Sequence, residues 1–110
     1  MVVGALMMTL HVQAASDLKA KRKVSRSVID RVRAKFNAAA CQLGAGDLWQ
    51  RLELGFTVCS NEVAHAQAQL DEIGRFVERL ALAEVVDVRQ EVLSLKDMAW
   101  APSQPPPWEA

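Results

Sequence analysis

Apolar and polar positions follow one another in six segments along the chain, and four of these segments are typical of strands. Val2–Val12 is the clearest, because its even positions are apolar throughout while its odd positions become polar towards the end. Leu48–Cys59 and Glu84–Leu95 also alternate with a two-residue period. Ala38–Leu43 is rich in alanine, and its assignment as a strand depends on the turn Gly44–Asp47 that joins it to the next segment.

The other two segments have the period of an amphipathic helix. The first begins at Ser16, whose hydroxyl suits an N-cap, with Asp17 at the positive end of the helix dipole. Its apolar residues fall on one side of a helical wheel, and they are Leu18, Val28, Ile29, Val32 and Phe36. The second helix begins at Ser60 or Asn61, and its core stripe comprises Val63, Ala66, Leu70, Ile73, Val77 and Leu80.

The order strand, helix, strand, strand, helix, strand predicts an α+β fold of the ferredoxin-like βαββαβ type. We expect a four-stranded antiparallel sheet with both helices on one face. A chain of 110 residues suits one such domain, at residues 1–95. Residues 96–110 contain all four prolines and are predicted to form a disordered tail.

The second face of the predicted sheet has no helix to cover it. Its expected polar residues are Arg51, Glu53, Thr57, Asp87, Arg89 and Glu91, and its expected apolar residues are Val3, Ala5, Met7, Val85 and Leu93. On the last strand the opposite parity, which comprises Val86, Val88 and Val92, is expected to face the helices. The mixed open face favours either a partner sheet or a flat ligand.

The sequence contains no recognisable catalytic constellation. His11 and His65 lie on different predicted elements, and neither has a Cys or Asp at metal-ligand spacing. There is no Gly-rich phosphate loop, no GxSxG and no HExxH motif. Cys41 and Cys59 lack CxxC spacing, and we interpret both as reduced, partly buried thiols. The chain is therefore predicted to be non-enzymatic and to use no metal and no cofactor.

The apolar opening of the chain resembles a secretion signal only superficially. No positive charge precedes it, and Thr9 and His11 interrupt the apolar run. No stretch approaches the ~20 apolar residues that cross a bilayer. We therefore expect a cytoplasmic protein with no membrane partner.

Charge is distributed unevenly along the chain although its formal net charge is zero. The segment 16–36 has eight of the thirteen Lys and Arg residues and two acids, a formal +6, while the remainder has five against eleven, a formal −6. On a helical wheel Lys19, Arg22, Arg26 and Arg33 fall within about 60°, with Lys23 slightly beyond. Such cations suit contacts with nucleic-acid phosphates. The alternative is a solvated helix face whose charges pair with acids elsewhere.

A second candidate site is Asp47–Arg51, where the predicted turn meets the third strand. Trp49 and Arg51 could stack on or bond to a nucleotide. Equally, Trp49 could cap the core while Asp47 satisfies backbone donors in the turn. A sheet that binds single-stranded RNA through exposed aromatic residues is not indicated, because no aromatic residues occupy the required strand positions.

The chain resembles the YlxP-like proteins, a small bacterial family classed as a domain of unknown function. The resemblance covers about residues 2 to 95. Its matching stretches are Ser16–Ser27, Asp30–Asn37, Asp47–Arg51, Ser60–Asn61 and Arg75–Glu78. The resemblance implies a ferredoxin-like domain with no established enzymatic activity. It also implies an association with translation, because such genes tend to neighbour those of initiation factors and a ribosome-binding factor. The alanine-rich Ala38–Leu43 departs from the family's β-branched second strand.

These observations lead to a hypothesis of a non-enzymatic accessory protein that associates with RNA or the ribosome through its first helix. Ribosomal RNA or a ribosomal subunit is the expected partner, and no sequence-specific readout of DNA is expected. The predicted nucleic-acid-binding residues are Lys19, Lys21, Arg22, Lys23, Arg26, Arg33, Trp49 and Arg51, with Asp47 and Gln50 beside them. The alternative hypothesis is a homodimeric interaction module that uses the open sheet face and has no nucleic-acid role. A regulator that binds a small ligand or metal is a third possibility, for which the fold alone is no argument.

Overall fold

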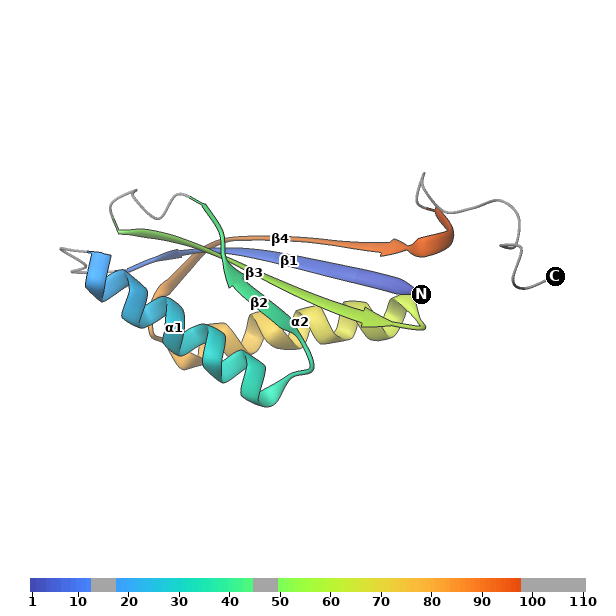
Figure 1. Ribbon diagram of the computed structural model, residues 1–110, viewed down its shortest axis with the longest axis horizontal. Helices are drawn as coiled ribbons and strands as arrows, with labels where there is room; N and C mark the ends of the chain where they lie inside the picture. The colour runs from blue at the N-terminus through green and yellow to red at the C-terminus, as the bar shows by residue number, and fades with distance from the viewer. Residues whose placement is uncertain (13–17, 45–49, 98–110) are drawn as a thin grey trace, which may run out of the picture.

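The computed structural model describes residues 1–12, 18–44 and 50–97. The elements follow in the order β1 (Val2–His11), α1 (Leu18–Lys35), β2 (Ala39–Gln42), β3 (Arg51–Ser60), α2 (Val63–Leu80) and β4 (Glu84–Ser94), and β4 continues into a 3₁₀ turn, η1 (Leu95–Asp97). Figure 1 shows this path. The predicted βαββαβ order is confirmed, with element bounds close to those expected.

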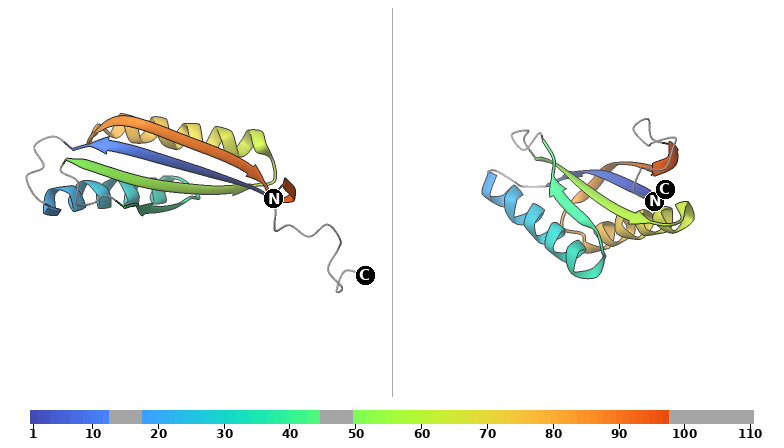
Figure 2. Two further views of the ribbon diagram at one scale, coloured as in Figure 1. Left: turned by 90° about the horizontal axis from the view of Figure 1, so that it is seen from above. Right: turned by 45° about the vertical axis from the view of Figure 1, so that its right-hand side comes forward.

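The four strands form one antiparallel sheet in the order β2-β3-β1-β4. The central strand β1 pairs with β3 along its whole length, from Val2 opposite Ser60 to His11 opposite Arg51. Both helices lie against the same face of the sheet, and no helix or strand of the described residues covers the opposite face (Figures 1 and 2). This arrangement is the predicted ferredoxin-like sandwich.

The hydrophobic core lies between the sheet and the two helices. Alternate residues of the central strands face the helices, because successive side chains of a strand point to opposite faces. These strand residues are at most 5% exposed, and they include Leu6, Met8, Leu10, Leu52, Leu54, Phe56 and Val58. The helices contribute Val28, Val32, Ala66, Leu70, Ile73 and Val77. Burial of each large aliphatic side chain stabilises the fold by about 1.5–3 kcal/mol.

Two aromatic rings join the helices at one end of this core. Phe36, which follows α1, packs edge-to-face on Phe76 of α2 with the ring centroids 5.5 Å apart. The Lys35 ammonium lies 4.7 Å from the centre of the Phe76 ring. This contact adds a cation–π interaction to the aromatic pair.

The start of α2 differs from the prediction in two respects. Glu62 is the N-cap and forms no side-chain capping bond, whereas the Ser60 hydroxyl accepts the Glu62 backbone N–H at 3.2 Å. Val63, which was predicted to be in the core, is 55% exposed. The first turn of α2 lies at the end of the sheet where β3 ends (Figure 1).

A bulge in β4 reverses the expected parity at its start. Asp87 pairs with Thr9 whereas Val85 pairs with Leu10, so that Val86 is an extra residue between the two pairs. The prediction for two valines is therefore wrong. Val85 packs against the core instead of lying on the open face, and Val86 is 53% exposed instead of facing the helices.

Beyond the bulge, β4 follows the predicted alternation. Val92 packs against the core, and Gln90 donates a hydrogen bond to Asp71 of α2 at 3.2 Å. Val88 lies opposite the buried Met8 but remains 45% exposed, because β4 is an edge strand.

Some sequence predictions concern residues outside the described ranges. These are the helix cap at Ser16, most of the turn before the third strand, and residues 98–110 of the predicted tail. Neither described helix is long and apolar enough to cross a membrane.

Substitutions at two glycines, Gly4 and Gly74, test the packing of α2 on the sheet. A Cβ at Gly4 of β1 would lie 3.0 Å from Leu70 Cδ1 and 3.2 Å from Val58 Cγ2. We expect Gly4→Ala to lower the free energy of unfolding by about 1–3 kcal/mol, because the added methyl group overpacks this contact. Urea denaturation followed by circular dichroism measures the change.

The matched control is Gly74→Ala within α2. A Cβ at Gly74 would meet nothing within 4 Å, so the substitution adds helix propensity without a clash. It should raise the free energy of unfolding by about 0.5–1 kcal/mol. A Gly4→Ala protein as stable as the wild type would contradict the close approach of Leu70 to β1.

Candidate functional site

The outer side of α1 presents a compact group of cations. The buried residues Val28 and Val32 fix the opposite side of the helix against the core, so that this side faces solvent. We define the basic strip as Lys19, Arg22, Lys23 and Arg26, all of which are exposed. Together with Ser27 and Asp30, these side chains surround a hollow of about 510 Å³.

The basic strip differs from the arginines of the sheet and of α2 in its electrostatic surroundings. The ion pairs of the described residues involve Arg51 with Glu53, Arg75 and Arg79 with Glu72, Arg89 with Asp87, and His11 near Glu84. None of these pairs includes a member of the basic strip. Among the described residues that line its hollow, Asp30 is the one acid, so four cations face one described carboxylate there.

The position of the basic strip along α1 is unfavourable for the helix itself. The first turn of α1 contains no acid, and Lys19, Arg22 and Lys23 lie within its first two turns. Cations near a helix N-terminus oppose the helix dipole, at a cost of about 0.3–1 kcal/mol each. Helix stability therefore does not account for the presence of these three charges.

Lys21 does not belong to this surface, contrary to the prediction. It is 4% exposed, whereas its neighbours Arg22 and Lys23 are exposed. At about 100° per residue, Lys21 lies about 200° round the helix from Lys19 and faces the protein. Its ammonium group is not presented to solvent.

Arg33 also departs from the prediction, through a contact with the sheet. Its guanidinium Nη2 donates a hydrogen bond to the Ala40 carbonyl oxygen at 2.9 Å. Ala40 belongs to the short edge strand β2, where backbone groups have no further strand to pair with. Arg33 therefore ties α1 to the sheet edge and does not line the hollow of the basic strip.

The second predicted site is separate from the basic strip. Asp47 and Trp49 lie outside the described residues. Arg51 is exposed on β3, and its Nε lies 3.9 Å from Glu53 Oε1. Together with His11 and Gln50 it lines a different hollow of about 470 Å³. The starts of β3 and α1 lie at the same end of the molecule, but in different layers (Figure 1).

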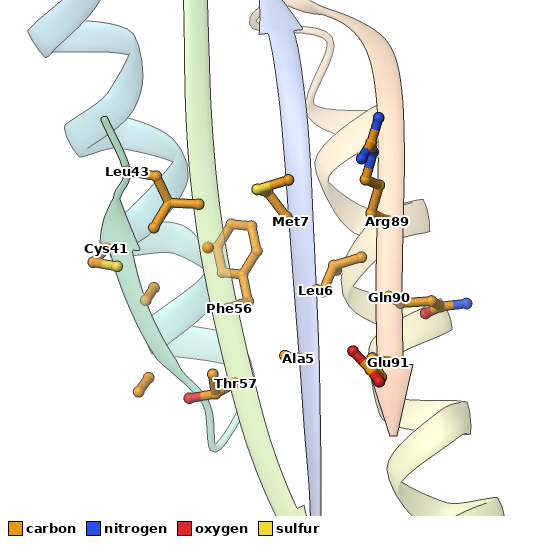
Figure 3. A pocket seen from close by; sticks show the side chains of 13 residues that line it. Ala5, Leu6, Met7, Cys41, Leu43, Phe56, Thr57, Arg89, Gln90 and Glu91 are labelled. Carbon is orange, nitrogen blue, oxygen red and sulfur yellow. The ribbon is translucent and has the colours of Figure 1, made fainter. Parts of the chain in front are cut away.

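The open face contains a hollow that the sequence did not reveal. It has a volume of about 430 Å³ and lies over the middle of the sheet (Figure 3). Its floor consists of short residues on three strands, which are Ala5, Ala39, Gly55 and Thr57. Leu43 forms one wall and lies so close to Gly55 that a Cβ there would meet Leu43 Cδ2 at 3.2 Å. Met7, Arg89 and Glu91 line the side towards β4.

The strand register was the signal that could have located this hollow. Gly55 lies between Cys41 on β2 and Met7 on β1, and Thr57 lies between Ala39 and Ala5. Small residues therefore adjoin one another across three strands, although they are far apart in the sequence.

Both cysteines face the open side of the sheet. They are free thiols, and both are exposed, so the prediction of partly buried thiols is wrong. Cys41 pairs with Gly55 and Cys59 pairs with Val3, which places each of them on the face that the helices do not cover. Cys41 also lines the hollow.

The histidines lie in separate polar contacts. His11 Nε2 is 3.1 Å from Gln50 Oε1, and exposed His65 has its Nδ1 3.2 Å from the Ser60 hydroxyl. Across residues 1–12, 18–44 and 50–97, no group of three or more His, Cys, Asp or Glu side chains comes together in a way that could hold a metal ion. Within the described part of the chain, the basic strip and the open-face hollow are the surfaces on which we base the proposals below.

Comparison with known proteins identifies the family. The family model described as a protein of unknown function, DUF503, matches residues 3–90. The chain belongs to this family. This family member is also 30% identical over 77 residues to the uncharacterized protein YlxP of Bacillus subtilis (strain 168). That match covers 70% of the chain and 84% of the relative, and it confirms the resemblance to the YlxP-like proteins.

Solved structures similar to this family member show its fold alone. A de novo designed protein with a ferredoxin fold, solved by NMR in solution, matches with a TM-score of 0.54 and 15% identity, over 94% of this chain and 95% of that chain. A C-terminal segment of the alpha subunit of aIF2 from Pyrococcus abyssi matches with a TM-score of 0.41 and 12% identity, over 84% and 49% of the two chains. The match to the aIF2 segment, with its TM-score of 0.41, supports no inference about partners.

The bond between Arg33 and Ala40 leads to a stability prediction. We expect Arg33→Ala to lower the free energy of unfolding by about 1 kcal/mol, because the β2 carbonyl loses a charged hydrogen-bond donor. Arg22→Ala removes the same side chain from the exposed basic strip and should change stability by less than about 0.5 kcal/mol. Urea denaturation of both variants provides the comparison. Equal stability of the two would contradict a structural role for Arg33.

Proposed function

We propose that this family member is a non-enzymatic cytoplasmic accessory protein that binds ribosomal RNA through the basic strip of α1. One observation carries the proposal. Four exposed cations surround one hollow, and the described residues that line it include a single carboxylate, whereas the arginines of α2 and of the open face have acidic partners. Cations without acidic partners in the described part of the chain are available to an external anion.

A polyphosphate chain suits the shape and chemistry of this surface. Lys19 and Arg26 are seven residues apart, or about 10 Å along a helix, so that the strip can contact more than one phosphate. Its long side chains carry charge but provide no rigid pattern for reading bases. The proposed binding is therefore directed at the backbone and does not depend on base sequence.

The rest of the molecule favours one orientation towards such a partner. Outside residues 16–36 the chain has a formal charge of −6, which repels a polyanion from the other surfaces. The association with translation that the YlxP-like resemblance implies favours ribosomal RNA over other polyanions. The competing interpretation is a solvated helix face that binds nothing.

A double substitution distinguishes these interpretations. We expect Arg22→Ala with Arg26→Ala to weaken binding to purified ribosomal RNA, because two phosphate contacts are lost. The slope of log K against log salt concentration should become shallower by about 1.4–1.8, since each phosphate contact contributes about 0.7–0.9. Fluorescence titration at several salt concentrations measures the affinity and the slope.

Arg75→Ala with Arg79→Ala is the matched control. This pair also consists of two exposed arginines four residues apart on a helix, but both lie near Glu72 on α2. It removes the same net charge and should leave the salt slope unchanged. If both double variants bind equally, or if the Arg22 and Arg26 variant binds as tightly as the wild type, the basic strip is only a solvated face.

A further inference from the structure

The open face has a pattern of charge and size that is complementary to itself. Two neighbouring rows of residues cross the sheet at the hollow. One row comprises Cys41, Gly55, Met7 and Arg89, and the next comprises Ala39, Thr57, Ala5 and Glu91. The first row ends on β4 in a cation and the second ends there in an anion, and both of these residues are exposed.

We propose that the open face packs against the same face of a second copy of this chain. The two-fold axis would lie parallel to the sheets, perpendicular to the strands, and between these two rows. Rotation by 180° about this axis keeps each strand over its own counterpart and exchanges the rows. Arg89 then faces the partner's Glu91, and Glu91 faces the partner's Arg89. This symmetry produces the same favourable contact twice, as an isologous interface requires.

The same rotation makes the hollow complementary to a side chain of the second copy. It places Met7 over the partner's Ala5, at the edge of the hollow floored by Ala5, Gly55 and Thr57. A methionine side chain is long and flexible and fills irregular apolar spaces well. Each hollow therefore receives one methionine from the other chain. Rows next to the axis stay in contact even when the two sheets cross at about 30°.

The size of the face suggests a weak dimer. Three strands of about ten residues and one short strand cover about 33 Å by about 15 Å. A face of these dimensions buries an area that is typical of transient interfaces and smaller than that of obligate ones. We therefore expect a dimer dissociation constant in the micromolar range. The helices lie on the opposite side of the sheet, so the dimer leaves both basic strips accessible (Figure 2). This inference is independent of RNA binding.

Charge reversal tests the proposed axis. Arg89→Glu places two acids opposite each other, and Glu91→Arg places two arginines opposite each other. Each single variant should therefore raise the dimer dissociation constant at least about tenfold. The Arg89→Glu, Glu91→Arg double variant restores both pairs, and its dissociation constant should return to within about threefold of the wild-type value. Sedimentation velocity from micromolar to millimolar concentration measures each constant.

Mixing the two single variants provides the most specific test. A heterodimer of Arg89→Glu with Glu91→Arg has opposite charges at both contacts, so the mixture should dimerise more tightly than either variant alone. Arg75→Glu on α2 is the control for charge reversal away from the open face, and it should not affect the dimer. Circular dichroism and urea denaturation verify that every variant is folded; loss of the exposed Arg89 to Asp87 ion pair costs little stability.

Several results would overturn the proposal. One is a wild-type protein that remains monomeric at millimolar concentration, which would leave the hollow to a small ligand or to another protein. Another is a dimer that both single variants leave unchanged, because it must use a different surface. A double variant as weak as the single ones would exclude the proposed two-fold axis.

Discussion

The central position of β1 is the constraint on which the rest of the structure depends. This strand pairs on both sides, and its helix-facing residues Leu6, Met8 and Leu10 are almost completely buried. Gly4 lets Leu70 of α2 come within van der Waals contact of the strand. The approach of α2 to β1 therefore fixes one helix over the middle of the sheet, while α1 lies nearer β2 and β3 (Figure 1).

This one-sided packing gives the molecule two independent surfaces. The helices carry the exposed charges of one side, and the strands present the mixed open face on the other (Figure 2). Arginines of the open face and of α2 form ion pairs with acids, whereas no ion pair of the described residues includes a cation of the basic strip. A formal net charge of zero therefore describes the whole chain but not any one surface. Contacts with a polyanion and with a second copy would not compete for the same residues.

Both surfaces occur where the local secondary structure is less stable than other residues would make it. The basic strip places cations at the end of α1 where the helix dipole disfavours them. The open-face hollow exists because Gly55, Ala5 and Ala39 have little side chain to pack, and alanine is a poor strand former. Arg33 strengthens the short β2 from outside through its bond to Ala40. Departures of this kind from optimal local structure are expected at functional positions.

The sequence by itself determined the order of the elements, the buried faces of β1 and β3, and the central core residues of α2. These features depend on periodicity within one segment, which local sequence encodes directly. It also located the cations of the basic strip, because helical spacing places them on one side. Only the tertiary structure decided the burial of Lys21, the bond of Arg33 to β2, the bulge at Val86, and the hollow around Gly55. Each of these features depends on contacts between residues that are distant in the chain and become neighbours when strands pair and helices pack. The periodicity of a single segment does not encode such contacts.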